Sequence, residues 1–251
     1  RVIPTLLLKG TGLVKTVKFK KPNYIGDPRN AIKIFNEKEV DELVFLDISA
    51  SKEKRAPNFR MLEEIASECF MPVGYGGGIR SLEDVKRIFN IGIEKVIFNT
   101  ACLENPALIK ETVKIAGSQS VVASIDVKMN WQGHYMVYAH RRKKKLNIRI
   151  LDHAKNLEDL GVGEILLNSV DRDGTYLGYD LALLQKTCKT LKVPVIACGG
   201  ASKLEDFRDA IQKGNASAVA AGSLFVYHGD SHHAVLINYP THDKLKNLFK
   251  E

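Results

Sequence analysis

The second half of this chain repeats the sequence pattern of the first half about 120 residues later. The segment GGIRSLEDV at 77–85 matches GGASKLEDF at 199–207, and DELVFLD at 41–47 resembles GEILLNS at 163–169. Internal repetition at a fixed period is a property of folds assembled from equivalent units. The repeat therefore predicts a fold made of two related halves.

Short apolar or β-branched runs alternate with amphipathic helical patterns along both halves. The predicted strands cover residues 2–8, 43–48, 71–76, 95–100, 120–126, 164–169, 193–199 and 217–223. Each strand–helix unit takes about 31 residues, the size of one βαβ module. Strands that alternate with helices predict a parallel sheet, and eight of them can close into a barrel. The predicted fold class is α/β, a (βα)8 TIM barrel built from two (βα)4 halves, as a single domain over residues 1–251. An open doubly wound sheet is the alternative, but it does not explain the spacing of the repeat.

Helix-start signals support this alternation. Asp27-Pro28 and Asn105-Pro106 each pair an N-cap residue with a proline at the first helical position. The segments SLED at 81–84 and SKLE at 202–205 resemble capping boxes.

The charge and the cysteines narrow the function classes. The formal net charge of +8 suits nucleic acid, an anionic surface or phosphorylated small molecules, and it also fits a merely solvated basic surface. No apolar run reaches the roughly 18 to 20 residues that a membrane span needs. The four cysteines lack CxxC spacing, so we expect reduced thiols, no metal site and a cytoplasmic protein.

Functional groups of such a barrel lie at the C-terminal ends of its strands. The segments CGGAS at 198–202 and AGS at 221–223 offer glycine backbone and hydroxyl groups, which suit a bound phosphate at a helix N-terminus. The repeat predicts a second site on the opposite rim, and two such sites suit a substrate with a phosphate at each end. The alternative is that these glycines only make tight turns. The predicted residues are Asp173, Gly174, Gly200, Gly222 and Ser223 on one side and Gly77, Asn99 and Thr100 on the other.

One position breaks the symmetry of the repeat. IPTLLLK at 3–9 and VASIDVK at 122–128 align at their lysines, Lys9 and Lys128, and this places Leu7 opposite Asp126. If the site uses two carboxylates as acid and base, a hydrocarbon replaces one of them. Asp47 ends a neighbouring strand, but nothing in the sequence indicates that it substitutes.

Two basic segments follow the first and the fifth predicted strands. The lysines Lys15, Lys18, Lys20 and Lys21 lie in a stretch that we expect to be a mobile active-site loop, able to close over an anionic substrate; a solvated loop is the alternative. RRKKK at 141–145 follows HYMVYAH, which is typical of an extra hairpin, and it is expected to be a solvated turn.

Several segments of ten to fifteen residues resemble the HisF family, the cyclase subunits of imidazole glycerol phosphate synthase. They are DELVFLDISAS at 41–51, GSQSVVASIDVK at 117–128 and GVGEILLNSVDRDGT at 161–175, with shorter matches at 76–79, 99–106 and 194–201. The resemblance implies an enzyme, a lyase or amidotransferase subunit without a cofactor. Its partner would be a HisH-like glutaminase docked at the N-terminal face, with ammonia passing through the barrel to a bisphosphorylated substrate.

The resemblance also assigns roles to single residues. It implies an ammonia gate formed by Arg1, Glu42, Lys95 and Glu164, whose signs alternate so that they can form a salt-bridge ring; an ion-pair ring that only adds stability is the alternative. It implies substrate-loop roles for Lys9 and Lys15. The catalytic aspartate of the fifth strand falls on Asp126, and that of the first strand falls on Leu7.

The missing aspartate leaves three functions open. TLLLKGTGLVKTVKF at 5–19, SAVAAGSLFVYHG at 217–229 and HHAVLINYP at 232–240 resemble HisF-like paralogues encoded with surface-polysaccharide genes. This resemblance implies acetamidino-sugar formation in lipopolysaccharide biosynthesis, with a sugar amidotransferase as a further partner. The alternatives are a working cyclase of histidine biosynthesis and a non-catalytic, ammonia-conducting scaffold. A phosphorylated small molecule is the expected ligand, with no nucleic acid and no membrane insertion.

Overall fold

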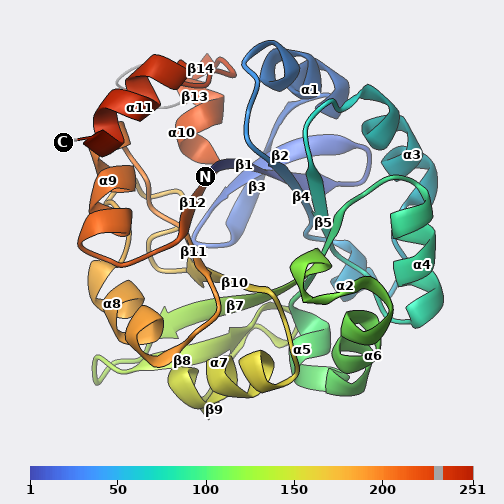
Figure 1. Cartoon of the computed structure of the whole chain (residues 1–251), viewed down its shortest axis with the longest axis vertical. Coiled ribbons are helices and arrows are strands. Elements are labelled where there is room, and N and C mark those ends of the chain that lie inside the picture. The colour runs from blue at the N-terminus through green and yellow to red at the C-terminus, as the bar shows by residue number, and fades with distance from the viewer. Residues whose placement is uncertain (229–233, 251) are drawn as a thin grey trace.

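The computed structural model describes residues 1–228 and 234–250, and within them eight parallel strands close into a barrel (Figure 1). Each strand pairs with the next, and the last pairs with the first through Val2 and Val219. Parts of the segments 217–229 and 232–240 lie outside the described residues. The predicted (βα)8 barrel is confirmed. Its strands are β1 (Val2–Lys9), β4 (Leu43–Asp47), β5 (Val73–Gly76), β6 (Lys95–Phe98), β7 (Val121–Met129), β10 (Glu164–Ser169), β11 (Val195–Cys198) and β12 (Ala218–Ala221).

A ring of helices surrounds the barrel (Figure 1). The longer ones are α1 (Pro28–Glu37), α3 (Phe59–Glu68), α4 (Leu82–Asn90), α6 (Pro106–Ala116), α7 (Ile150–Asp159), α8 (Leu181–Thr190), α9 (Leu204–Gln212) and α11 (His242–Lys250). Short elements add α2 (Ala50–Glu53), α5 (Thr100–Glu104), α10 (Ser223–Val226), the 3-10 turns η1 (Ser118–Ser120) and η2 (His140–Arg142), and the pair β13 (Tyr227–His228) and β14 (Ala234–Val235).

The predicted helix caps are present, with one shift. Asp27 and Asn105 cap α1 and α6 with their side chains, and Ser81 and Asp84 form the capping box of α4. At α9 the acid that accepts the backbone N–H bonds is Asp206, not the predicted Glu205. Asp206 is the repeat partner of Asp84, so the two halves cap their equivalent helices with the same acid.

Two apolar layers hold the barrel together. The larger lies between the strands and the helices, where side chains such as Phe45, Phe98 and Phe207 are fully buried. The smaller fills the barrel interior. Its buried residues are Ile3, Val44, Ile97, Val122, Leu166, Ile196, Ala218 and Ala220.

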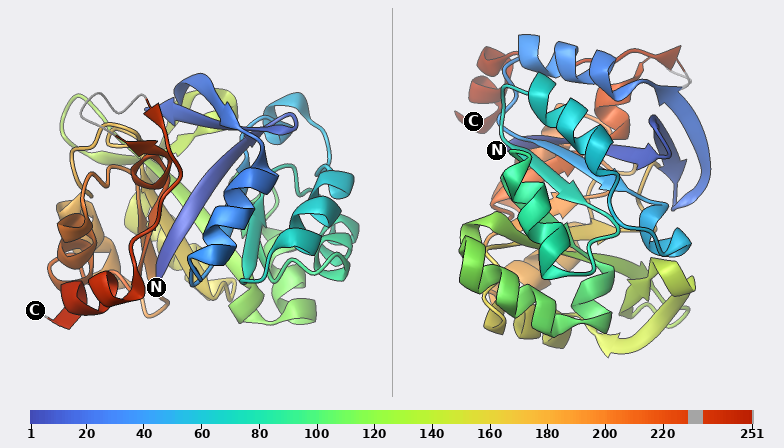
Figure 2. Two further views of the ribbon diagram at one scale, coloured as in Figure 1. Left: turned by 90° about the horizontal axis from the view of Figure 1, so that it is seen from above. Right: turned by 90° about the vertical axis from the view of Figure 1, so that its right-hand side faces the viewer.

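Two antiparallel hairpins extend the sheet at the C-terminal end of the barrel, away from the N-terminus (Figure 2). β2 (Gly12–Val17) and β3 (Lys20–Gly26) continue from β1, while β8 (Tyr135–Ala139) and β9 (Lys144–Arg149) continue from β7. The second hairpin is as predicted. The first replaces the predicted loop: its turn places Lys18 and Phe19 at φ values of 50° and 62°. Such turns normally use Asn or Gly, so these residues give no turn signal.

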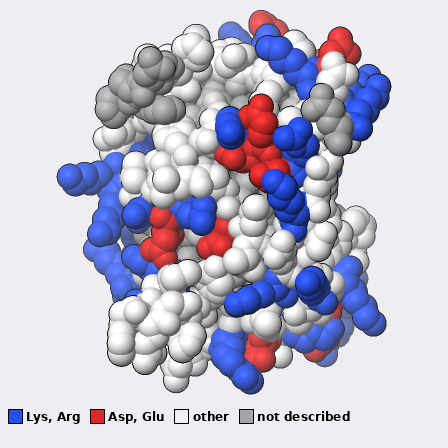
Figure 3. Space-filling view, turned by 90° about the vertical axis from the view of Figure 1, so that its left-hand side faces the viewer, with Lys and Arg blue, Asp and Glu red and all other residues white. Residues whose placement is uncertain are grey.

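Basic and acidic side chains are interspersed over the side of the molecule that Figure 3 shows. The excess of positive charge is therefore not gathered into one patch on that face. Among the described residues, no helix combines the length and the apolar character that crossing a bilayer requires.

Candidate active site

A cavity of about 440 Å³ opens at the C-terminal end of the barrel. It brings together every residue predicted for catalysis and phosphate binding, together with Lys9 and Lys15. Those residues are Leu7, Lys9, Lys15, Gly77, Asn99, Thr100, Asp126, Asp173, Gly174, Gly200, Gly222 and Ser223. Lys18, Lys20 and Lys21 of the predicted active-site loop are exposed and do not line it.

The strand order places the repeat-related groups across this cavity from one another. β1, which carries Leu7, lies four strands from β7, which carries Asp126. β6 and β12 are likewise four strands apart, and the segments after them supply Thr100 and Ser223. A ligand with anionic groups at both ends can therefore span the barrel mouth.

The two predicted phosphate sites have matching backbone geometry. Thr100 begins α5 and Ser223 begins α10, and no side chain caps either helix, so first-turn N–H groups remain available to an anion. At Gly77 the backbone has φ of 125°, and a Cβ there would lie 2.6 Å from the Asp47 carbonyl oxygen. Tyr75 fixes this loop, because its hydroxyl donates to the Gly77 carbonyl at 3.0 Å.

Asp126 is a buried carboxyl that holds its proton unusually well. Its pKa is raised from 3.8 to about 7, chiefly by burial, and the neighbouring Asp173 carboxylate contributes to the rise. Hydrogen bonds from Asn99 and Asn168 act in the opposite direction. The Asn99 amide lies 3.1 Å from the Asp126 carboxylate, so its side chain serves this acid, a contact that the sequence did not indicate. An acid with a pKa near 7 can both donate and accept a proton at neutral pH.

Lys15 is buried in the cavity rather than solvated on a loop. Burial lowers its pKa, and the nearby Asp173 carboxylate opposes that shift. Its Nζ occupies the space beside Gly222, where a Cβ would lie 2.0 Å from the amine. Gly222 therefore leaves room for the Lys15 amine beside the predicted phosphate site at the start of α10.

The β2–β3 hairpin reaches this position by folding across the cavity mouth. Its Lys18 N–H donates to the Asp173 carbonyl oxygen at 2.9 Å, and the Thr16 hydroxyl lies 3.3 Å from the Asp173 carboxylate. Gly174 permits the contact, because a Cβ there would lie 2.4 Å from the Thr16 carbonyl oxygen. Phe19 at the hairpin tip packs edge-on against His140. The hairpin is thus docked as a lid over the site.

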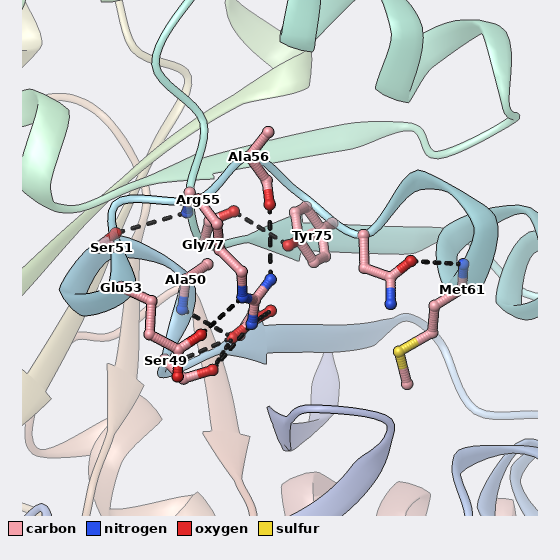
Figure 4. A network of polar contacts seen from close by, with 12 residues as sticks. Ser49, Ala50, Ser51, Glu53, Arg55, Ala56, Met61, Tyr75 and Gly77 are labelled. Carbon is pink, nitrogen blue, oxygen red and sulfur yellow. Dashed lines mark hydrogen bonds and ion pairs between the residues drawn. The ribbon is translucent and has the colours of Figure 1, made fainter.

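Asp47 does not replace the missing acid at position 7, because its carboxylate is held by Ser49, Ala50 and Arg55, three residues that Figure 4 labels. Its carboxylate accepts hydrogen bonds from the backbone and hydroxyl of Ser49 and from the Ala50 N–H, each at 3.0 Å. Arg55 adds an ion pair at 2.7 Å. With its oxygens committed to these donors, Asp47 acts as a structural anchor of the loop that leads into α2.

The four predicted gate residues meet at the opposite end of the barrel. Lys95 Nζ lies 2.9 Å from a carboxylate oxygen of Glu42 and 2.9 Å from one of Glu164. Arg1 pairs with the same two glutamates. The side chains of Glu42 and Glu164 are only 4% and 11% exposed. The four charges form a closed ring across the N-terminal mouth.

Further cavity residues went unnoticed in the sequence, among them Phe19, His140 and Lys52. Phe19 and His140 come from the two hairpins, and Lys52 comes from α2. RRKKK is also more than a solvated turn, since Arg141 lines the cavity and pairs with Glu104. The available signal was the repeat, which places a hairpin after both β1 and β7.

The fold and site together define a (βα)8-barrel protein with an anion-suited cavity on one face and an ion-pair ring on the other. The chain belongs to the HisF family: a family model described as Histidine biosynthesis protein matches residues 1–231. A Pseudomonas aeruginosa protein named "Putative imidazole glycerol phosphate synthase subunit hisF2" is 54% identical over 245 residues, covering 98% of this chain and 97% of that protein.

More distant relatives carry related names. A Leptospira interrogans protein, "Putative imidazole glycerol phosphate synthase subunit HisF", is 50% identical over 250 residues, covering 99% of this chain and 98% of that protein. "Imidazole glycerol phosphate synthase subunit HisF" of Alkaliphilus metalliredigens is 40% identical over 227 residues, covering 90% of each chain. The similarity therefore spans nearly the whole barrel.

Proposed function

We propose that this chain is the synthase subunit of a cytoplasmic glutamine amidotransferase complex. A HisH-like glutaminase binds its N-terminal face, and ammonia enters through the ring of Arg1, Glu42, Lys95 and Glu164. The interior beyond the ring is lined by apolar side chains such as Ile97 and Leu166, which suit a small neutral molecule. The cavity at the other end supplies the acceptor site.

The acceptor is proposed to be a surface sugar rather than the histidine-pathway substrate. The observation that carries this proposal is Leu7, which lines the same cavity as Asp126 where the repeat places an acid. Leucine cannot transfer a proton, and Asp47 is bound to Arg55. The product is proposed to be an acetamidino group on a lipopolysaccharide sugar, formed together with a sugar amidotransferase.

The test is a turnover assay with purified protein, ammonia and the bisphosphorylated histidine-pathway intermediate. We expect no imidazole product, whereas a verified HisF run in parallel should give it. Turnover near that of the control would refute the proposal that the acceptor is a surface sugar rather than the histidine-pathway substrate. Co-purification of the chain with its partners would then identify what accepts the nitrogen.

A working histidine-pathway cyclase is the second candidate, and Asp173 favours it. This buried carboxyl lines the cavity, acts electrostatically on Asp126, and has a pKa raised by burial. The pair could share the acid and base roles. This candidate predicts imidazole product from the wild type and its loss in both Asp126→Asn and Asp173→Asn.

A non-catalytic conduit is the remaining alternative. It predicts that the chain stimulates its glutaminase but binds no phosphate in the cavity. Anions seated at both Gly77/Thr100 and Gly200/Ser223 in a phosphate soak would exclude it.

A further inference from the structure

Basic groups from three separate elements converge at the mouth of the cavity. Lys9 ends β1, Lys52 lies in α2, and His140 lies in η2 between β8 and β9; all three line the cavity. Lys143 follows η2 and is close enough to lower the pKa of both Lys52 and His140. Elements far apart in sequence thus bring like charges to one place.

The lysines of this cluster have no acidic partner among residues 1–228 and 234–250. No carboxylate oxygen there lies within 4.0 Å of Nζ of Lys9, Lys52 or Lys143. The neighbouring acids are engaged elsewhere: Glu53 pairs with Arg55 at 2.8 Å, as Asp47 does at 2.7 Å. Unpaired like charges raise the local potential and favour an anion between them.

His140 supplies a second observation that points to a ligand. Its Nδ1 is buried and has no hydrogen-bond partner among the described residues, although its ring lines the cavity. Buried polar atoms normally have a partner. The pKa of His140 is lowered to about 4, chiefly by burial and also by the nearby Lys52 and Lys143, so the ring is neutral at pH 7. Phe19 holds the ring edge-on at 5.1 Å between centroids.

We propose that Lys9, Lys52 and His140, which all line the cavity, form a third anion-binding subsite, which holds a carboxylate or phosphate group of the acceptor; Lys143, the C-cap residue of η2, adds positive charge next to it. The inference rests on the proposed function and narrows its substrate class to an acceptor with a third anionic group. Leu7 is consistent with it, because β1 then presents a hydrocarbon rather than a repelling carboxylate beside this subsite.

The test measures phosphate binding by equilibrium dialysis at low ionic strength. The wild type should bind three phosphates, whereas Lys52→Gln should bind the third about fivefold more weakly, the effect of removing one charge near an anion in water-accessible surroundings. Lys110→Gln, an exposed α6 lysine outside the cavity lining, is the matched control. His140→Phe keeps the ring packing, removes Nδ1, and should also weaken only the third event.

Two further measurements give the position of the third bound anion and its chemical class. Crystals soaked in selenate should show an anomalous peak between Lys52 and His140. Malonate is then added as a competitor of the bound phosphate. If it displaces only the third phosphate, the subsite prefers a carboxylate; if the third phosphate stays bound, the subsite prefers a phosphate.

Two phosphates bound by the wild type, or equal effects of Lys52→Gln and Lys110→Gln, would overturn this inference and leave the proposed function standing. Absence of phosphate binding at the two other sites would instead count against the proposed function.

Discussion

Replacing Asp126 by Asn should make the protein more stable at alkaline pH, because the native carboxyl resists ionisation. Its pKa is raised from 3.8 to about 7, chiefly by burial. Between these two values the unfolded chain releases a proton that the folded chain retains, so the free energy of unfolding falls as pH rises. The loss is about 1.4 kcal/mol per pH unit, or about 4 kcal/mol as an upper bound over the full interval.

The amide introduced by Asp126→Asn would keep the shape of the side chain and could still accept the hydrogen bond from Asn99. Urea unfolding of both proteins from pH 5 to pH 8.5 measures the difference. The variant should gain about 3 kcal/mol relative to wild type between pH 5 and 8, with no further gain above the native pKa. Asp173 interacts electrostatically with Asp126, so the same pair of profiles is also measured in an Asp173→Asn background, where this coupling is absent. Asp243→Asn, at an exposed carboxyl, is the control. If the free energy of unfolding depended on pH in the same way for wild type and Asp126→Asn, the conclusion that burial opposes ionisation of Asp126 would be refuted.

Three more outcomes follow from the same structure. Lys95→Ala should destabilise the protein by about 3–5 kcal/mol in urea unfolding, because Glu42 and Glu164 stay buried with one cation fewer. Lys95→Arg should recover most of this stability. A loss of stability equal to that from replacing a surface lysine would contradict the closed ring. Leu7→Asp should give measurable imidazole product from ammonia if only the acid is missing; continued inactivity of a folded variant would mean that the surroundings of β1 differ too. Phe19→Ala should speed phosphate release in stopped-flow measurements by undocking the lid, and an unchanged rate would show that the hairpin does not cover the ligand.

The barrel itself was accessible from sequence because strand and helix periodicities alternate cleanly. The repeat identified which segments are equivalent, whereas the local motif that was used for the cap of α9 pointed to Glu205 and the structure has Asp206 there. The cavity residues followed from the rule that strand ends converge on one face.

The lid was predicted only as a mobile loop able to close over a substrate, and not as a docked hairpin, for a physical reason. Lys15, Lys18 and Lys20 are typical of a solvated loop, and the turn at Lys18 and Phe19 lacks Asn or Gly. The hairpin is held by tertiary contacts to Asp173 and Gly174, which lie about 155 residues further along the chain. Contacts over that separation leave no local pattern, and the same holds for Asn99 on Asp126.

The β2–β3 lid and strand β1, which carries Leu7, are hydrogen-bonded to each other as neighbouring strands of one sheet. Leu7 is paired on one side with Val14 of the lid and on the other with Leu46 of β4. A shift of the hairpin therefore displaces the backbone at position 7. A bulkier or charged residue at position 7 in turn displaces the hairpin. Access to the cavity and the chemistry at the end of β1 therefore depend on each other. We expect a change of reaction at this position to be accompanied by substitutions in the β2–β3 hairpin.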